Sequence, residues 1–175
     1  MDLNRIITYT ITILIFIVYA STGFSQNKDC QSFLDQAKQT NSKTEIEKLY
    51  RKAAECGDEP TQFYLGTMYY DVAEELRNDF AKSTNELEKS LIEADIRSTG
   101  NDAIKYLKMA ADNGHSGAQA YLCLIYYEGH FVDQSYNEAR SWAKKVESNH
   151  RSTSKEKASV EAVLNRIEMW ESLGW

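Results

Sequence analysis

The residues of this chain that could act as catalysts or metal ligands are few and widely spaced. The three histidines, His115, His130 and His150, are 15 and 20 positions apart, whereas a metal site on one helix needs ligands about one turn apart. We therefore expect no metal site. We also expect His115, at the start of a helix, and His130, in a loop, to lie on the surface.

Serine and lysine occur at a spacing that one enzyme class uses. Ser-x-x-Lys begins at Ser141, Ser152 and Ser154, but the β-lactamase use of that spacing also needs Ser-Asp-Asn and Lys-Thr-Gly motifs, and the chain has neither. Gly-x-Ser-x-Gly, phosphate-loop and dinucleotide glycine motifs are absent as well. The sequence predicts a protein that is not an enzyme and uses no cofactor, with β-lactam hydrolysis as the least favoured alternative.

The three cysteines are too few for a metal site or a disulfide framework. Cys123 lies in an apolar helical run and is expected to be a small buried hydrophobe. In an oxidising compartment one bridge can form, and if any pair does, we predict Cys30 with Cys56. The alternative is three free, buried thiols.

Composition and charge narrow the fold class and the partner. The 175 residues are 42% hydrophobic and include eight glycines and one proline, which favours one helical domain over a turn-rich β-sandwich. The net charge of −6 makes nucleic acid a poor candidate partner.

The N-terminus has the pattern of a secretory signal peptide. Residues 6–27 carry no charge, Arg5 precedes them, and small residues follow the apolar run. We predict a signal peptide over residues 1–25 with cleavage after Ser25; cleavage after Ala20 also fits. The protein would then be periplasmic or secreted and free of the membrane. The alternative is an uncleaved N-terminal anchor helix.

An internal repeat is the most informative feature of the chain. Residues 48–70 and 105–127 are identical at nine of 23 positions without a gap, at an offset of 57. Ala103-x-x-Tyr106 recurs as Ala139-x-x-Trp142, at an offset of 36. A unit of 36 residues with a glycine between two helical runs is typical of an α-solenoid, so the first copy carries 21 extra residues.

The repeat defines the expected organisation. After the signal peptide, we expect an N-terminal capping segment (26–43) and a repeat domain (44–175). The repeat domain is divided into repeat one (about 44–71), an insertion (72–100), repeat two (about 101–136) and a third helix pair (137–172). We expect the insertion to form one or two extra helices and the last helix, about 153–172, to cap the solenoid. Capping-box spacing predicts helix starts at Thr44, Ser83, Ser135 and Thr153.

Charge is uneven along the chain. Residues 71–98 contain eight acids and four bases, whereas residues 140–157 contain six bases and two acids. Two solvated helix faces explain this, and the alternative is that both ends of the molecule steer a charged partner.

The repeat resembles the Sel-one-like repeat family, a branch of the tetratricopeptide superfamily. The motif residues in the second copy are Ala110-Ala111, Gly114, Ala118-Gln119, Leu122, Tyr126 and Gly129, and those in the first are Lys52-Ala53-Ala54, Gly57, Gln62, Leu65-Gly66 and Tyr69. Three residues depart from the family pattern: Cys123 for the helix glycine, Phe131 for the loop glycine and Thr61 for the alanine. The resemblance implies a right-handed, all-α solenoid that binds a protein or peptide on its concave face.

The same resemblance places six side chains in that concave groove: Phe63, Thr67, Tyr70, Ala120, Leu124 and Tyr127. The alternative is that they pack between units as core. The function expected is an exported, monomeric protein–protein interaction module. An inhibitor of the immunity type, neutralising a toxin that acts in the periplasm, is the second candidate.

Overall fold

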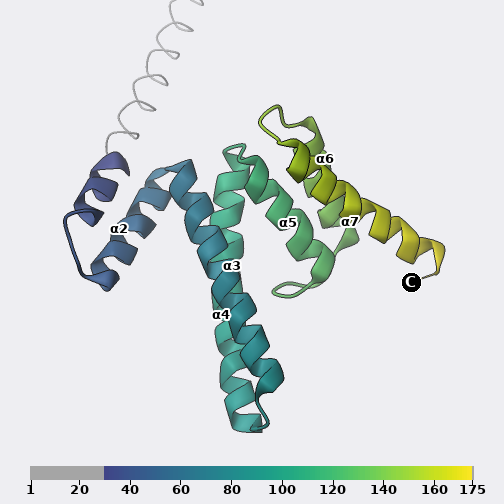
Figure 1. Ribbon diagram of the computed structural model, residues 1–175, viewed down its shortest axis with the longest axis horizontal. Helices are drawn as coiled ribbons and strands as arrows, with labels where there is room; N and C mark the ends of the chain where they lie inside the picture. The colour runs from purple at the N-terminus through teal and green to yellow at the C-terminus, as the bar shows by residue number, and fades with distance from the viewer. Residues whose placement is uncertain (1–29, 175) are drawn as a thin grey trace, which may run out of the picture. The chain divides into compact units, whose positions relative to one another are not determined.

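The computed structural model describes residues 30–174, and every regular element among them is a helix (Figure 1). This confirms the all-α solenoid class predicted from the repeat. The signal peptide predicted for residues 1–25 lies outside the described residues. Of the helices that are described, none is long and apolar enough to cross a membrane. The chain divides after Asp58 into two compact units, which we describe separately.

The first unit contains a short described helical segment, residues 30–37, and helix α2 (Lys43–Cys56). The start of α2 differs from the prediction. Its N-cap is Ser42, whose hydroxyl accepts a hydrogen bond from the Glu45 backbone amide, so the capping box expected at Thr44 does not form. Ser42 and Thr44 are both good capping residues, and spacing alone did not distinguish them.

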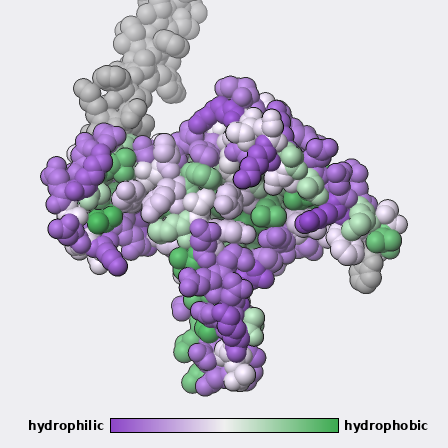
Figure 2. All heavy atoms as spheres, in the orientation of Figure 1, coloured by the Kyte–Doolittle hydropathy of each residue, from purple (hydrophilic) through white to green (hydrophobic). Residues whose placement is uncertain are grey.

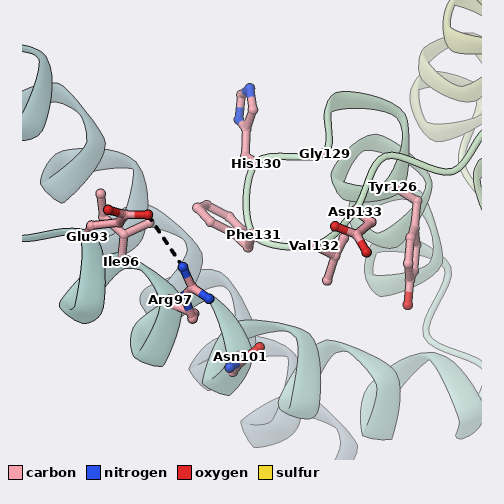
Figure 3. Close-up of a pocket in the computed structure, with 10 residues that line it drawn as sticks. All are labelled: Glu93, Ile96, Arg97, Asn101, Tyr126, Gly129, His130, Phe131, Val132 and Asp133. Atoms are coloured by element: carbon pink, nitrogen blue, oxygen red, sulfur yellow. Dashed lines mark hydrogen bonds and ion pairs between the residues drawn. The ribbon is translucent and has the colours of Figure 1, made fainter. Parts of the chain in front are cut away.

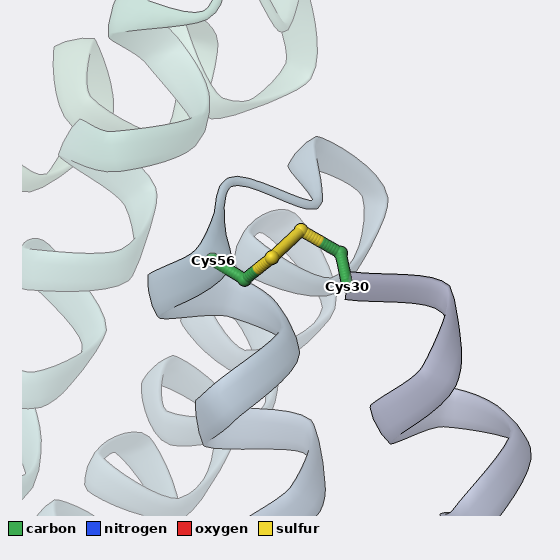
Figure 4. The surroundings of a disulfide bond; sticks show 2 residues. All are labelled: Cys30 and Cys56. Atoms are coloured by element: carbon green, nitrogen blue, oxygen red, sulfur yellow. A yellow bond between two sulfur atoms is a disulfide. The ribbon is translucent and has the colours of Figure 1, made fainter. Parts of the chain in front are cut away.

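A disulfide joins the two helices of this unit. Cys30, in the short helix, is bonded to Cys56, the last residue of α2, with a Cα–Cα distance of 5.4 Å (Figure 4). The Lys52 ammonium lies 5.5 Å from the centre of the Phe33 ring, which adds a second contact between the same helices. Cys123 is free and buried.

The second unit is a series of helices joined by short loops. They are α3 (Glu59–Lys82), α4 (Glu86–Asp112), α5 (Ser116–Glu128), α6 (Tyr136–Ser148) and α7 (Ser154–Ser172). Short loops make successive helices antiparallel neighbours, and α4 with α5 and α6 with α7 form the second and third helix pairs. Ser135 and Thr153 cap α6 and α7 at the predicted positions.

The insertion does not form helices of its own. It lengthens the helices on either side, so α3 has 24 residues and α4 has 27 whereas α5 and α6 have 13 each. The extended halves pair as a two-helix arm that projects beyond α5 (Figure 1). The N-cap of α4 is Asn85, not Ser83, because the Asn85 side chain accepts from two backbone amides.

On α4, the residues that helical spacing places inward are buried: Ala103, Tyr106, Leu107, Ala110 and Ala111. On α5, Ala118, Leu122 and Ile125 are buried, whereas Tyr121 and Tyr126 are only partly buried. In α7, Val160, Val163 and Ile167 are buried as expected for a capping helix, but Trp170 is 38% exposed. The alanines let neighbouring helices approach closely, and the larger side chains fill the space between them.

Equivalent glycines end the first helix of both copies. Gly57 and Gly114, at the repeat offset of 57, have φ of +114° and +85°. This left-handed conformation is strained for any residue with a Cβ. The shared geometry shows that the sequence repeat is also a repeat of local structure.

Buried glutamines tie successive repeats of the second unit together. The Asn113 side-chain amide donates to Oε1 of Gln62 at 2.8 Å, and the Asn149 amide donates to Oε1 of Gln119 at 3.0 Å. The glutamines are 57 residues apart and the asparagines 36 apart, which are the two repeat offsets. Each glutamine lies on the second helix of its repeat, and it accepts a hydrogen bond from the asparagine that follows the first helix of the next repeat.

Candidate partner-binding groove

A groove in the second unit gathers most of the predicted site residues. It has a volume of about 510 Å³ and lies between α3, α5 and the start of α7. The lining residues are Phe63, Tyr70, Gly117, Ala120, Tyr121, Leu124, Thr153, Lys155, Glu156 and Ser159. One wall is therefore apolar and aromatic, and the other is polar.

The apolar wall is held by ring contacts around Tyr121. The Tyr121 ring meets Tyr70 edge-on at a centroid distance of 5.3 Å and Phe63 at 6.0 Å. Burial raises the pKa of Tyr70 well above its usual range, and the nearby Glu128 and Glu74 carboxylates raise it further. Burial, followed by Asp71, also raises the pKa of Tyr121. Both phenols therefore stay neutral.

The polar wall is the first turn of α7, which Glu156 fixes in place. Its carboxylate accepts from the Thr153 backbone amide at 2.7 Å and from the Ser116 hydroxyl at 3.1 Å. Burial alone would raise the pKa of Glu156, but these hydrogen bonds outweigh that effect and lower the pKa. The ionised carboxylate thus joins the start of α7 to the start of α5 and sets the width of the groove.

The structure separates the six predicted residues into two groups. Phe63, Tyr70, Ala120 and Leu124 line the groove. The Thr67 hydroxyl donates to the backbone carbonyls of its own helix, at Phe63 and Tyr64. The Tyr127 ring stacks on Tyr136 at 6.1 Å. Neither Thr67 nor Tyr127 is among the lining residues.

The prediction missed Tyr121, Gly117 and the whole of the α7 wall. Gly117, Tyr121 and Leu124 follow one another at helical spacing along the groove side of α5. The helical period alone therefore indicates that Gly117 and Tyr121 share a face with Leu124. The α7 wall carries no repeat motif, so the sequence had no marker for it.

Two histidines expected on the surface are half-buried. His115 is the N-cap of α5: its Nδ1 accepts from the Ala118 amide at 3.2 Å, and its ring stacks on Phe63 at 4.0 Å. His130 contacts Glu74 at 3.1 Å and also Arg77. Both side chains are less exposed than the sequence suggested because they contact α3, and contacts between distant segments leave no local signal.

The stability of the protein should depend on pH because His115 caps α5. Burial lowers its pKa, with Glu59 opposing and Arg151 reinforcing the shift, so the unfolded chain takes up a proton at higher pH than the folded one. Stability is then complete above the ordinary pKa near 6.5 and is lost as pH falls below it. Urea unfolding between pH 7.5 and 5 measures this.

The matched control is His115→Asn, which keeps a capping side chain that does not titrate. We expect the variant to lose less stability than the natural protein over this pH range. Parallel curves for the two proteins would contradict the assignment.

The free cysteine and the potential metal ligands of the described residues add no second candidate site. No group of three or more His, Cys, Asp or Glu residues could hold a metal ion within residues 30–174. Cys123 is fully buried, and burial raises the pKa of its thiol to about 12. A protonated, inaccessible thiol is a poor nucleophile.

The fold and the groove together define a helical repeat protein with a surface suited to binding. Comparison with protein families identifies the repeat: the Sel1 repeat model matches residues 47–58, 93–115 and 116–145. Sel1 repeats are generally protein-interaction modules. A search of curated proteins finds no match.

Proposed function

We propose that the protein is an exported interaction module that binds an apolar segment of another protein in the groove between α3, α5 and α7, and that it acts by binding alone. The groove is the observation that carries this proposal. It combines a wall of three aromatic rings and Leu124 with a polar wall, which is the composition of an interface with aromatic anchors.

Two features of the groove favour a partner that inserts a side chain into it over a partner that only lies across it. The volume of about 510 Å³ is enough for one or two large side chains. The neutral phenols of Tyr70 and Tyr121 can exchange hydrogen bonds with a partner backbone without the desolvation penalty of a charge. The partner is therefore a protein or peptide that presents an aromatic or branched side chain.

Export is part of the proposal. The uncharged run of residues 6–27 after Arg5 supports it, as does the bond between Cys30 and Cys56, because structural disulfides persist in oxidising compartments. Binding would then take place outside the cytoplasm.

Site-specific cross-linking tests the proposal. A photoreactive amino acid at Ser159, an exposed position on the polar wall, should capture a protein partner in the envelope fraction or culture medium of the native host. The matched control is Glu161, two residues further along α7, exposed and outside the groove. Capture at Ser159 alone is the expected result. Equal capture at both positions, or none at Ser159, would argue against the groove.

A further inference from the structure

The arm formed by α3 and α4 carries a second surface that the groove does not explain. Leu87 and Leu91 lie in the first two turns of the long helix α4, and their side chains are 72% and 63% exposed. With Ala94 they follow at spacings of four and three residues, so they share one face of the helix. Hydrophobic side chains along one edge of the arm are visible in Figure 2.

This face is distinct from the one that holds the arm together. Ile92 and Ile96 are partly buried in the arm, and Ile96 packs against the core of the unit. Leu87 and Leu91 therefore do not serve the pairing of α3 with α4. Two leucines one turn apart, turned away from the core, are typical of a helix that binds a further helix.

Open clefts continue the same face toward the body of the unit. One, of about 470 Å³, runs along α4 past Ser90, Ala94 and Ser98. The next, of about 650 Å³, lies between α4 and the loop Gly129–Asp133 (Figure 3). Both clefts include Glu93, Arg97 and Asn101, so they adjoin along α4 between Ser90 and that loop.

The charges beside the leucines indicate what covers them. Glu88 and Asp95 flank the apolar face on one side and Glu93 on the other, and all three are exposed. Residues 86–98 contain four acids and two bases. The two bases pair with acids of the same helix, Lys89 with Glu86 at 3.1 Å and Arg97 with Glu93 at 3.4 Å. With eight acids and four bases over residues 71–98, the arm is strongly acidic.

We infer that the arm surface, made of Leu87, Leu91 and Ala94 with Glu88, Glu93 and Asp95, binds a basic amphipathic helix of a partner protein. The partner's apolar residues cover the two leucines, and its lysines or arginines meet the carboxylates. A second copy of this chain that docked through the same surface would bring like charges together, and an anionic membrane would be repelled. The arm surface shares no lining residue with the groove, so the two can be occupied at once.

A pair of synthetic peptides tests this inference. One is a 14-residue helix-forming peptide of leucine and lysine with the leucines along one face, and the other has glutamate in place of lysine. We expect the basic peptide to bind the protein in fluorescence anisotropy and the acidic peptide not to bind. Leu87→Ser with Leu91→Ser should weaken binding at least tenfold without changing the melting temperature, because both side chains are exposed.

Two further variants test whether peptide binding depends on the charge and the position of the arm surface. Glu88→Lys with Asp95→Lys should weaken binding of the basic peptide and allow the acidic peptide to bind. Leu173→Ser is the matched control, since Leu173 is 62% exposed in the same unit and lies off the arm. Equal binding of the basic peptide to the natural protein and to the Leu87→Ser, Leu91→Ser variant would overturn the inference, as would a dimer that this variant dissociates.

Discussion

Replacing Gly66 with alanine should lower the free energy of unfolding by about 2 to 3 kcal/mol, as overpacking of a close helix contact does. A Cβ at this position would lie 2.7 Å from Cγ of Leu107 and 2.9 Å from the Leu107 backbone nitrogen. Leu107 is fully buried in α4, so α3 and α4 would have to separate. Chemical denaturation of the two proteins measures the loss.

The sign of the change in the free energy of unfolding distinguishes a close helix contact from an open position. At an open position inside a helix, alanine in place of glycine stabilises by roughly 1 kcal/mol, so a gain would show that α3 and α4 do not approach as described. Thr67→Ala, one residue further along α3, is the control. It removes one methyl group and a hydroxyl that donates to its own helix, and should have a small effect.

Loss of the disulfide should have the largest effect of any change in the first unit. Cys30 and Cys56 are 26 positions apart, and opening a loop of that size destabilises by about 3.5 kcal/mol in the chain-entropy model. The double replacement by serine should therefore release residues 30–37 from α2, and hydrogen exchange should become fast in both helices.

Counting thiols checks the pairing itself. The unfolded, unreduced protein should contain one reactive thiol, from Cys123, and three after reduction. Three thiols before reduction would mean that the bond is absent, and the stability of the double-serine variant would then match that of the natural protein.

The sequence predicted the features that depend on local pattern. Helix spacing and Gly114 set the end of α4, and capping residues set the starts of α6 and α7. Leu65 and Tyr69, which match the motif of the repeat family, are both buried. These signals are local because glycine conformation, capping and helical period each act within a few residues.

The features that the sequence did not predict depend on contacts between distant segments. The insertion has helical spacing whether it forms new helices or extends old ones, and only the pairing of α3 with α4 decides between them. The lining of the groove also depends on contacts between distant segments. Tyr127 has the register of a groove residue but stacks on Tyr136 of the next helix, and α7 completes a wall that no motif marks.

The central claim, that the partner binds between α3, α5 and α7, is tested most directly by filling that space. Ala120 lines the groove and is only partly buried, so Ala120→Trp should occupy the cavity without disturbing the core. Titration calorimetry with the partner captured at Ser159 should give a dissociation constant at least tenfold weaker, or about 1.4 kcal/mol, with little change in melting temperature. Tyr127→Trp, an equally large residue on the same helix outside the groove, should bind normally. Unchanged affinity of the Ala120→Trp variant would contradict the account.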